Sequence, residues 1–481
     1  MRPSLALRLA LAGTRTDRLR VALTAVTAAL ATALALAAAT LLSLDNRTLR
    51  RYQVIVVDQP DLRELTVYAL VIACLPVLAL AAQATRIGAP ARHRRLAALR
   101  LAGATPRQVT AVVAAETGAA AALGGLAGLA VFELARLLLH RRDAAGRWWL
   151  ATDVRLGPVA HAVILIGLPA LAALLAAVLT RSLHGSPLST ATRAARTRAP
   201  RLWPLLAVGA GVLTFVLLGT ADVLFAPGFL LGLGSSAAMA GGLVLGMAWI
   251  SERSGRLLHR FGRGPAALLA ARRLRADPWT GSRTVGVLVV CALIAGALLA
   301  LRDYHRTSAL AYVLSNARPV PGGTELDYQG SAMRMLGTGV GFAAAVAAVG
   351  ILLALLETVA ARRRAFAALT AGGVTRGVLV RALLWQAMLP VMVAVPGAAL
   401  LGAALARVLV GEVAVTAVYA CYPADCSDAV VRAPVRTLPW FVDGVEFTAV
   451  SLGGLALVAL LAVVAGATLR ERTDLAALRA T

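Results

Sequence analysis

The residues of this chain that are suited to chemistry are few, and most lie in apolar surroundings. Glu116 and Glu357 are carboxylates inside strongly apolar segments, where an ionised group is costly and is therefore a candidate for function. Each lies near one end of its segment, so a structural ion pair with an arginine is the favoured interpretation. The six histidines show neither HxxxH nor HExxH spacing, and no Ser/His/Asp set can be identified. The sequence therefore predicts no metal site, no catalytic site and no cofactor bound by this chain.

The basic residues exclude one class of enzyme. All 48 are arginines, whereas a nucleotide-binding P-loop requires a lysine that reaches the phosphates. Any ATP-driven work must therefore come from a partner. The net charge of +25 would suit nucleic acid, but the arginines cluster in short gaps between apolar runs, so we expect no nucleic-acid partner. Arginine without lysine, with abundant Ala, Gly, Leu and Val, indicates a GC-rich bacterial genome.

The elements that position these residues are long apolar runs. The chain is 59% hydrophobic and only 15% charged, whereas a soluble protein has about a quarter charged residues. We therefore expect an all-α polytopic protein of the lipid bilayer, with runs that cross the roughly 30 Å hydrocarbon layer. Ten such spans are predicted, at about 20–43, 65–84, 109–135, 158–180, 203–220, 226–250, 284–301, 335–357, 382–410 and 446–468.

The distribution of arginine orients these spans. Alternate gaps are rich in arginine, and the others are mixed or acidic; the basic gaps are 83–108, 181–201, 251–283 and 358–381. By the positive-inside rule, both termini and the basic gaps lie in the cytoplasm. The chain is thus predicted to be a multi-pass protein of the plasma membrane, with short outer loops.

Several residues are predicted to lie at the outer side. Cys421 and Cys426, in CYPADC, lie in the last outer loop, where a disulfide between them and two free thiols remain alternative interpretations. Asp303 ends a span and is expected to be solvated, and Glu133 and Arg136, one turn apart, are expected to pair. Outer-loop tryptophans are expected to anchor at the membrane interface: Trp148, Trp149 and Trp440.

An internal repeat gives the domain organisation. The segment RRLAALRLAGATPRQV recurs in outline as RRAFAALTAGGVTRGVLV, so that Gly103 and Thr105 fall on Gly373 and Thr375 at one constant offset. The basic segment before span one matches the one before span seven at nearly the same offset. This predicts two parallel four-helix units, in 1–200 and 263–481, joined by a two-helix connector in 201–262. Coincidence in so Ala- and Leu-rich a chain is the alternative.

The block RHRRLAALRLAGATPRQVTAVVAAETGAAAALGGLAGL resembles the signature of FtsX/MacB-type ABC transporter permeases. The resemblance extends more weakly to the second copy. It implies a permease whose loop between the second and third helices of each repeat is a coupling helix that docks on a cytosolic ATP-binding-cassette ATPase, which binds ATP and Mg²⁺. The coupling residues so implied are Arg94, Arg95, Leu96, Leu99, Arg100, Gly103, Ala104 and Thr105, and in the second copy Arg364, Phe366, Leu369, Gly372, Gly373 and Thr375.

The chain departs from the family pattern in three respects. Where the family usually has an acidic residue in the basic stretch, this chain has Arg95 in the first copy and Arg364 in the second. The recurrent glutamate, Glu116, becomes Gln386 in the second copy; together with Glu357 these residues form a candidate intramembrane polar site. The large extracellular domain common in the family is absent, which favours a lipophilic or amphipathic substrate reached from the membrane.

The physical pattern agrees with coupling. Leu96, Leu99 and Gly103 follow 3–4 spacing, which predicts a helix with an apolar stripe, and Gly103 and Gly373 suit helix ends. Such a helix docks on a partner or lies on anionic lipid headgroups, and its duplication favours the partner. GGLAG, at 124–128, has a spacing that permits close helix contact.

The resulting hypothesis is the membrane subunit of an ABC transporter, in which two ATPase subunits drive export or extraction of a substrate such as a peptide antibiotic or lipid. A second hypothesis is a non-transporting relay that activates an outer-surface enzyme or a sensor kinase. A third, an ion-coupled secondary transporter, predicts paired mid-membrane carboxylates, and none is clearly placed. A membrane enzyme is the least favoured.

Overall fold

A computed structural model describes residues 15–44, 51–54, 101–143, 146–184, 203–220, 225–315, 324–361, 363–415 and 436–467, and isolated positions between 57 and 98. Within these residues, eight helices are long and apolar enough to cross a membrane, and Trp203–Leu218 is a shorter apolar helix. Each coincides with a predicted span. The remaining predicted span, 65–84, lies largely outside the described residues. The protein is an all-α polytopic membrane protein, as its composition predicts.

By its internal contacts the chain divides into two compact units. Unit 1 comprises Met1–Arg198 and Phe342–Arg363, and unit 2 comprises Ala199–Gly341 and Arg364–Thr481. The long helix α13 (Thr324–Ala361) therefore contributes to both. The repeat boundaries predicted from the sequence remain a prediction.

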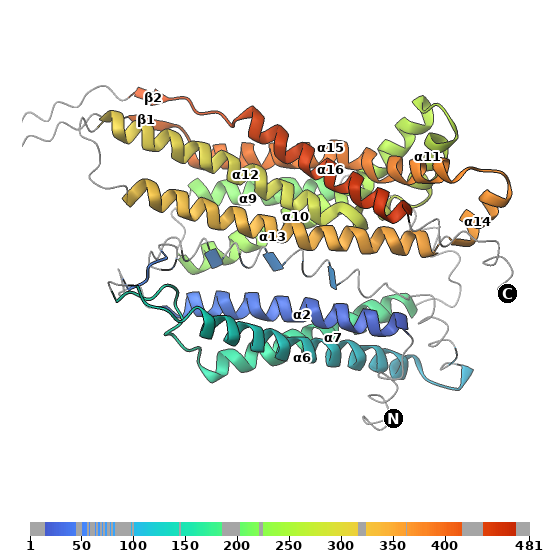
Figure 1. Cartoon of the computed structure of the whole chain (residues 1–481), viewed down its shortest axis with the longest axis horizontal. Coiled ribbons are helices and arrows are strands. Elements are labelled where there is room, and N and C mark those ends of the chain that lie inside the picture. Colours follow the sequence, from blue (N-terminus) through green and yellow to red (C-terminus); the bar gives the residue numbers. More distant parts are fainter. Residues whose placement is uncertain are drawn as a thin grey trace, which may run out of the picture. The chain divides into compact units, whose positions relative to one another are not determined.

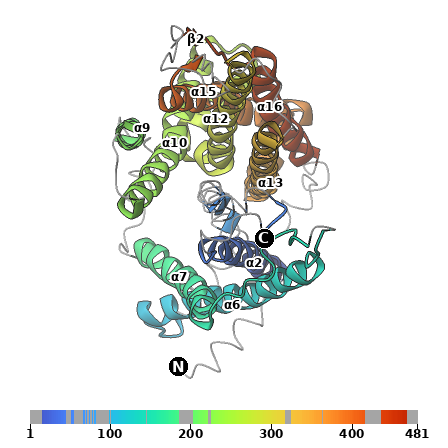
Figure 2. The same ribbon diagram turned by 90° about the vertical axis from the view of Figure 1, so that its left-hand side faces the viewer.

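Unit 1 is built on three long helices that run side by side (Figures 1 and 2). They are α2 (Arg15–Leu42), α6 (Pro106–Leu138) and α7 (Pro158–His184). Gly124 and Gly128 of α6 face the backbone of α2 so closely that an added Cβ would clash with the carbonyl oxygens of Ala25 and Ala29. The close contact that the spacing of GGLAG permits is therefore present.

Unit 2 is built around the pair formed by α12 (Trp279–Ser315) and α15 (Arg376–Val410), which make the most extensive helix contact in the described chain. Here, too, glycine allows the approach: a Cβ at Gly296 would clash with the backbone of Ala399, and one at Gly402 with that of Leu293. Besides the first part of α13, the helices of this unit are α9 (Trp203–Thr220), α10 (Phe225–Phe261), α11 (Pro265–Ala276), α12, α14 (Arg363–Ala371), α15 and α16 (Gly444–Ala467).

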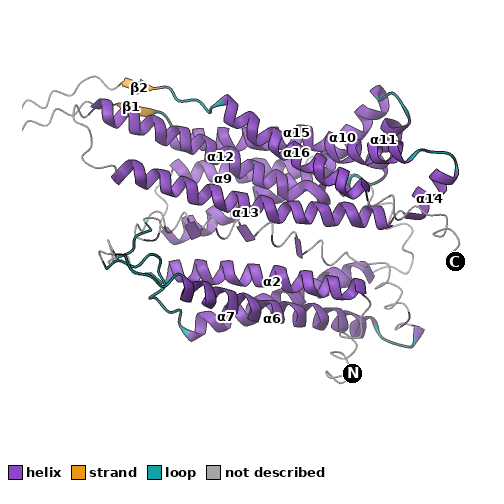
Figure 3. Ribbon diagram, viewed as in Figure 1, coloured by secondary structure: helices purple, strands orange, loops and turns teal. Residues whose placement is uncertain are grey.

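The two ends of unit 2 differ in structure (Figure 3). One end carries α11 and α14, and the other carries a two-stranded antiparallel pair, β1 (Val413–Val415) and β2 (Arg436–Leu438). We call the end that carries α14 the turn end and the opposite one the distal end. In unit 1 the turn end is the one at which α6 begins. The arginine distribution predicts that the turn ends are cytoplasmic.

The distal end of unit 2 corrects two expectations. Asp303 is not solvated: it is 8% exposed, and its carboxylate accepts the backbone N–H of Asp443, 2.9 Å away, directly before α16 begins. A carboxylate is stabilised there by the unpaired N–H groups and dipole of the helix. Trp440 is not an interfacial anchor, because it is only 3% exposed and packs edge-on to Tyr304 with 5.8 Å between ring centroids.

Candidate functional site

The second predicted coupling element is a short helix that ends in a glycine turn. The N–H of Val374 donates to the carbonyl of Leu369, and that of Gly373 to the carbonyl of Thr370, both at 3.0 Å. These two bonds form the Schellman motif, which requires a left-handed residue at the position of Gly373. Gly373 has φ 86°, and an added Cβ would meet open space, so that only the backbone demands glycine there.

In the first copy of the repeat, the aligned glycine adopts the same left-handed conformation. Gly103 has φ 87°, and the N–H of Ala102 donates to the carbonyl of Ala98 at 3.0 Å, as that of Gly372 does to Ala368. Helix ends at both glycines, which their positions in the sequence suggested, are thus confirmed. Of the first-copy coupling residues, Gly103, Ala104 and Thr105 are described; Arg94, Arg95, Leu96, Leu99 and Arg100 lie outside the described residues, as do Cys421 and Cys426.

Directly after each glycine turn, a threonine begins the next long helix. Thr105 and Thr375 have nearly the same backbone angles, φ −70° with ψ 155° and φ −67° with ψ 146°. Thr105 forms a capping box with Gln108: its N–H donates to the side-chain carbonyl at 2.9 Å, and its hydroxyl accepts the N–H of Gln108 at 3.4 Å. Thr375 makes no side-chain cap bond. The turn is therefore joined directly to α6 in one copy and to α15 in the other.

Phe366, which is aligned with Leu96 of the predicted apolar stripe, faces the protein itself. Phe366 is 1% exposed, and the guanidinium of Arg273, on α11, lies 4.7 Å from the centre of its ring. A cation above an aromatic face is an attractive contact that strengthens away from water. The exposed residues of this element are Ala365, Ala368 and those of the turn, Ala371 to Thr375, of which Val374 is partly buried. In the first copy, Leu101, which is aligned with Ala371, is 91% exposed.

The candidate intramembrane polar site is an ion pair in one copy only. Glu116 pairs with Arg20 of α2, and both side chains are 7% exposed. Gln386, at the aligned position of α15, is also 7% exposed, and its Oε1 atom has no hydrogen-bond partner among the described residues. The residue aligned with Arg20 is Val285. Glu357 is partly buried near the C-terminal end of α13, apart from this pair in sequence and element.

Two regions, 67–192 and 337–473, match the family model described as FtsX-like permease, C-terminal. Each region contains one of the two glycine turns, and together the regions cover more than half of the chain. The chain belongs to the FtsX-like permease family. Members are generally non-catalytic membrane subunits that usually partner with cytosolic ABC ATPases, so this permease is a membrane subunit of an ABC-type system. No curated protein sequence matches the permease significantly.

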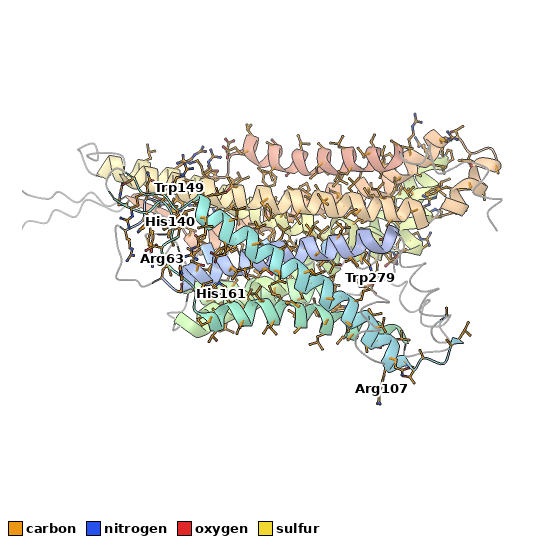
Figure 4. All side chains as sticks on the ribbon, turned by 60° about the horizontal axis from the view of Figure 1, so that its bottom comes forward. Arg63, Arg107, His140, Trp149, His161 and Trp279 are labelled. Carbon is orange, nitrogen blue, oxygen red and sulfur yellow. The ribbon has the colours of Figure 1, made fainter. Side chains whose placement is uncertain are left out.

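The distal end of unit 1 of the permease is a folded assembly of two loops that periodicity did not predict. The N–H of Gln53 donates to the carbonyl of Trp148 at 2.7 Å, joining loops that are distant in the sequence. Burial, and after it the carboxylate of Asp153, raises the pKa of Tyr52 to about 12. Trp149, which is 41% exposed, lies at this end with His140 (Figure 4). The density of Arg, His and Trp between spans three and four is the sequence signal that could have indicated this assembly.

Proposed function

We propose that this permease couples ATP hydrolysis by two cytosolic ABC ATPase subunits to the export or extraction of a lipophilic or amphipathic substrate, such as a lipid or a peptide antibiotic. The observation that carries the proposal is the pair of glycine turns, one in each copy of the repeat, which have φ 87° at Gly103 and 86° at Gly373. Two copies of one ATPase subunit require two docking surfaces of the same shape. ATP and Mg²⁺ would be bound by those subunits.

The helices attached to the turns provide a route for the motion. In the first copy, a displacement of the Gly103 turn passes directly to α6, whose 33 residues extend for about 50 Å. α6 is in backbone contact with α2 at Gly124 and Gly128 and is paired to it through Glu116. A push on the turn would therefore move α6 and α2 together instead of bending α6 alone.

The test is co-expression of the permease with a candidate ABC ATPase, followed by co-purification and measurement of substrate-stimulated ATPase activity. Gly103→Ala and Gly373→Ala place a Cβ on a left-handed residue at a cost of about 1–2 kcal/mol, which shifts the turn away from its docking shape. We expect about tenfold weaker association with the ATPase. Gly146→Ala is the matched control, because Gly146 has φ 76°, faces open space and lies at the distal end of unit 1.

The proposal fails if no ABC ATPase associates with the permease, or if Gly146→Ala weakens association as much as the turn variants do. The relay hypothesis is separated in the same preparation. A relay would keep ATPase association and its sensitivity to Gly103→Ala, but reconstituted vesicles would show no ATP-dependent movement of any lipid or amphipathic peptide.

A further inference from the structure

A pocket of about 400 Å³ opens at the distal end of unit 1, among residues that the coupling mechanism does not use. Its walls come from the end of α6, from the loop that follows and from the first turn of α7; Figure 4 labels His140 and His161 at this end. The polar residues that line it are Glu133, Arg136, His140, Thr152, Arg155 and His161. Two guanidinium groups thus face one carboxylate, so the pocket carries a net positive charge.

Arg136 is held in place by the protein. Its Nη1 atom lies 3.2 Å from the carboxylate of Glu133, as the one-turn spacing predicts, and its Nε donates to the carbonyl of Thr152 at 3.0 Å. These described bonds leave Nη2 for a further acceptor. Arg155, in contrast, is exposed and has no described ion pair, so its whole guanidinium is available to a ligand.

In both histidines of the pocket, Nδ1 contacts the protein and Nε2 remains for a ligand. Nδ1 of His161 lies 3.2 Å from the carbonyl of Gly157, which can only accept, and Nδ1 of His140 lies 3.0 Å from the hydroxyl of Thr152. That hydroxyl is in turn 3.4 Å from the carbonyl of Leu150; when it donates there, Nδ1 of His140 is also a donor. The Nε2 atoms remain, and a neutral imidazole accepts a proton there, whereas a protonated one donates.

These groups fit a phosphate better than a carboxylate or a cation. A phosphate monoester offers several acceptor oxygens to the two guanidiniums and, in its monoanion, an O–H that a neutral Nε2 accepts. Leu137 of α6, which also lines the pocket, is 73% exposed, and Val159, in the first turn of α7, is 74% exposed; both helices are long and apolar enough to cross a membrane. An apolar chain attached to the phosphate can lie along these side chains. We propose that the pocket binds the phosphate headgroup of a membrane amphiphile.

The proposal concerns binding and does not rest on ATP-driven transport. Its test is calorimetric titration of the purified permease, in phosphate-free detergent buffer, with three probes: dihexanoyl phosphatidic acid, inorganic phosphate and dihexanoylglycerol. We expect phosphatidic acid to bind at least tenfold more tightly than either of the others. Arg155→Gln removes a charge-assisted bond and is expected to weaken phosphatidic acid binding roughly tenfold. Because Arg155 is exposed, this variant leaves the fold intact.

Arg141→Gln is the matched control, since Arg141 is exposed on the same loop but does not line the pocket. Unchanged affinity in this variant supports the proposal. An equal loss in both variants would show general electrostatic attraction and would overturn it. If inorganic phosphate binds as tightly as phosphatidic acid, the ligand is free phosphate and not an amphiphile. If dihexanoylglycerol binds as tightly as phosphatidic acid, or if phosphatidic acid does not bind, the pocket is not a phosphate headgroup site.

Discussion

The buried ion pair between Arg20 and Glu116 yields a quantitative prediction, because the second copy of the repeat has two uncharged residues at the aligned positions. Both side chains are 7% exposed, so water screens their interaction little. Glu116→Gln leaves the guanidinium of Arg20 buried without its counter-charge. Removing one partner of such a pair costs about 3–5 kcal/mol, because the remaining charge stays desolvated.

Removing both charges is expected to cost far less. The double variant Arg20→Val/Glu116→Gln reproduces the combination found in the second copy, Val285 and Gln386, where the glutamine is equally buried. Buried ion pairs replaced as a whole by uncharged groups are often nearly neutral for stability. The two single losses should therefore exceed the loss in the double variant by several kcal/mol, which a double-mutant cycle measures directly.

The assay is the free energy of unfolding of the purified permease in mixed micelles of dodecylmaltoside and an increasing fraction of SDS. Glu252→Gln is the control, since Glu252 pairs with Arg256 one turn away on α10 with side chains 24% and 57% exposed. Exposed pairs of this kind contribute at most about 1 kcal/mol. A strong buried ion pair is ruled out if Glu116→Gln lowers the free energy of unfolding as little as Glu252→Gln does, or if the double variant loses the sum of the two single losses.

Three further outcomes follow from the described contacts. Gly402→Val should destabilise the permease by about 1–3 kcal/mol through the clash with α12, whereas Gly397→Val, which meets open space on the same helix, should not; thermal unfolding compares them. Thr105→Ala should cost about 1 kcal/mol and speed hydrogen exchange in the first turn of α6, whereas Thr375→Ala, with no cap bond to lose, should leave α15 nearly unchanged. The folded loops raise the pKa of Tyr52 to about 12, against 10 in the unfolded chain. The free energy of unfolding should therefore fall as the pH rises from 10 to 12, because only the unfolded chain then loses the proton, and Tyr52→Phe should remove that loss.

The sequence predicted well those features that depend on local pattern. Hydropathy located the described spans because each must be apolar along its length, whatever its neighbours. Glycine located both turns, because the left-handed conformation at Gly103 and Gly373 excludes most other residues. The spacing of Gly124 and Gly128 permitted a close contact without requiring one, since glycines four residues apart keep one face of a helix free of side chains.

Features that depend on tertiary contacts could not be predicted in this way. The 3–4 spacing identifies an apolar stripe but not what covers it, and Phe366 proved to pack beneath Arg273 of α11, within the protein. Asp303 and Trp440 were expected at a solvated or lipid-facing surface because they end or follow a span. Asp303 is buried by its contact with Asp443, directly before α16, and Trp440 is buried by packing with residues of α12 and α15. Each contact joins residues that are far apart in the sequence, and no periodicity encodes it.

The differences between the two copies indicate which property of the repeat matters for function. The side-chain contacts differ between the copies. Thr105 has a capping box and Thr375 has none, and Glu116, which forms an ion pair, is replaced by the uncharged Gln386 in the second copy. The backbone of the glycine turn, in contrast, agrees to within a degree in φ. If identical ATPase subunits dock on the two turns, as proposed, only the backbone has to agree, because each copy can stabilise that shape by its own means.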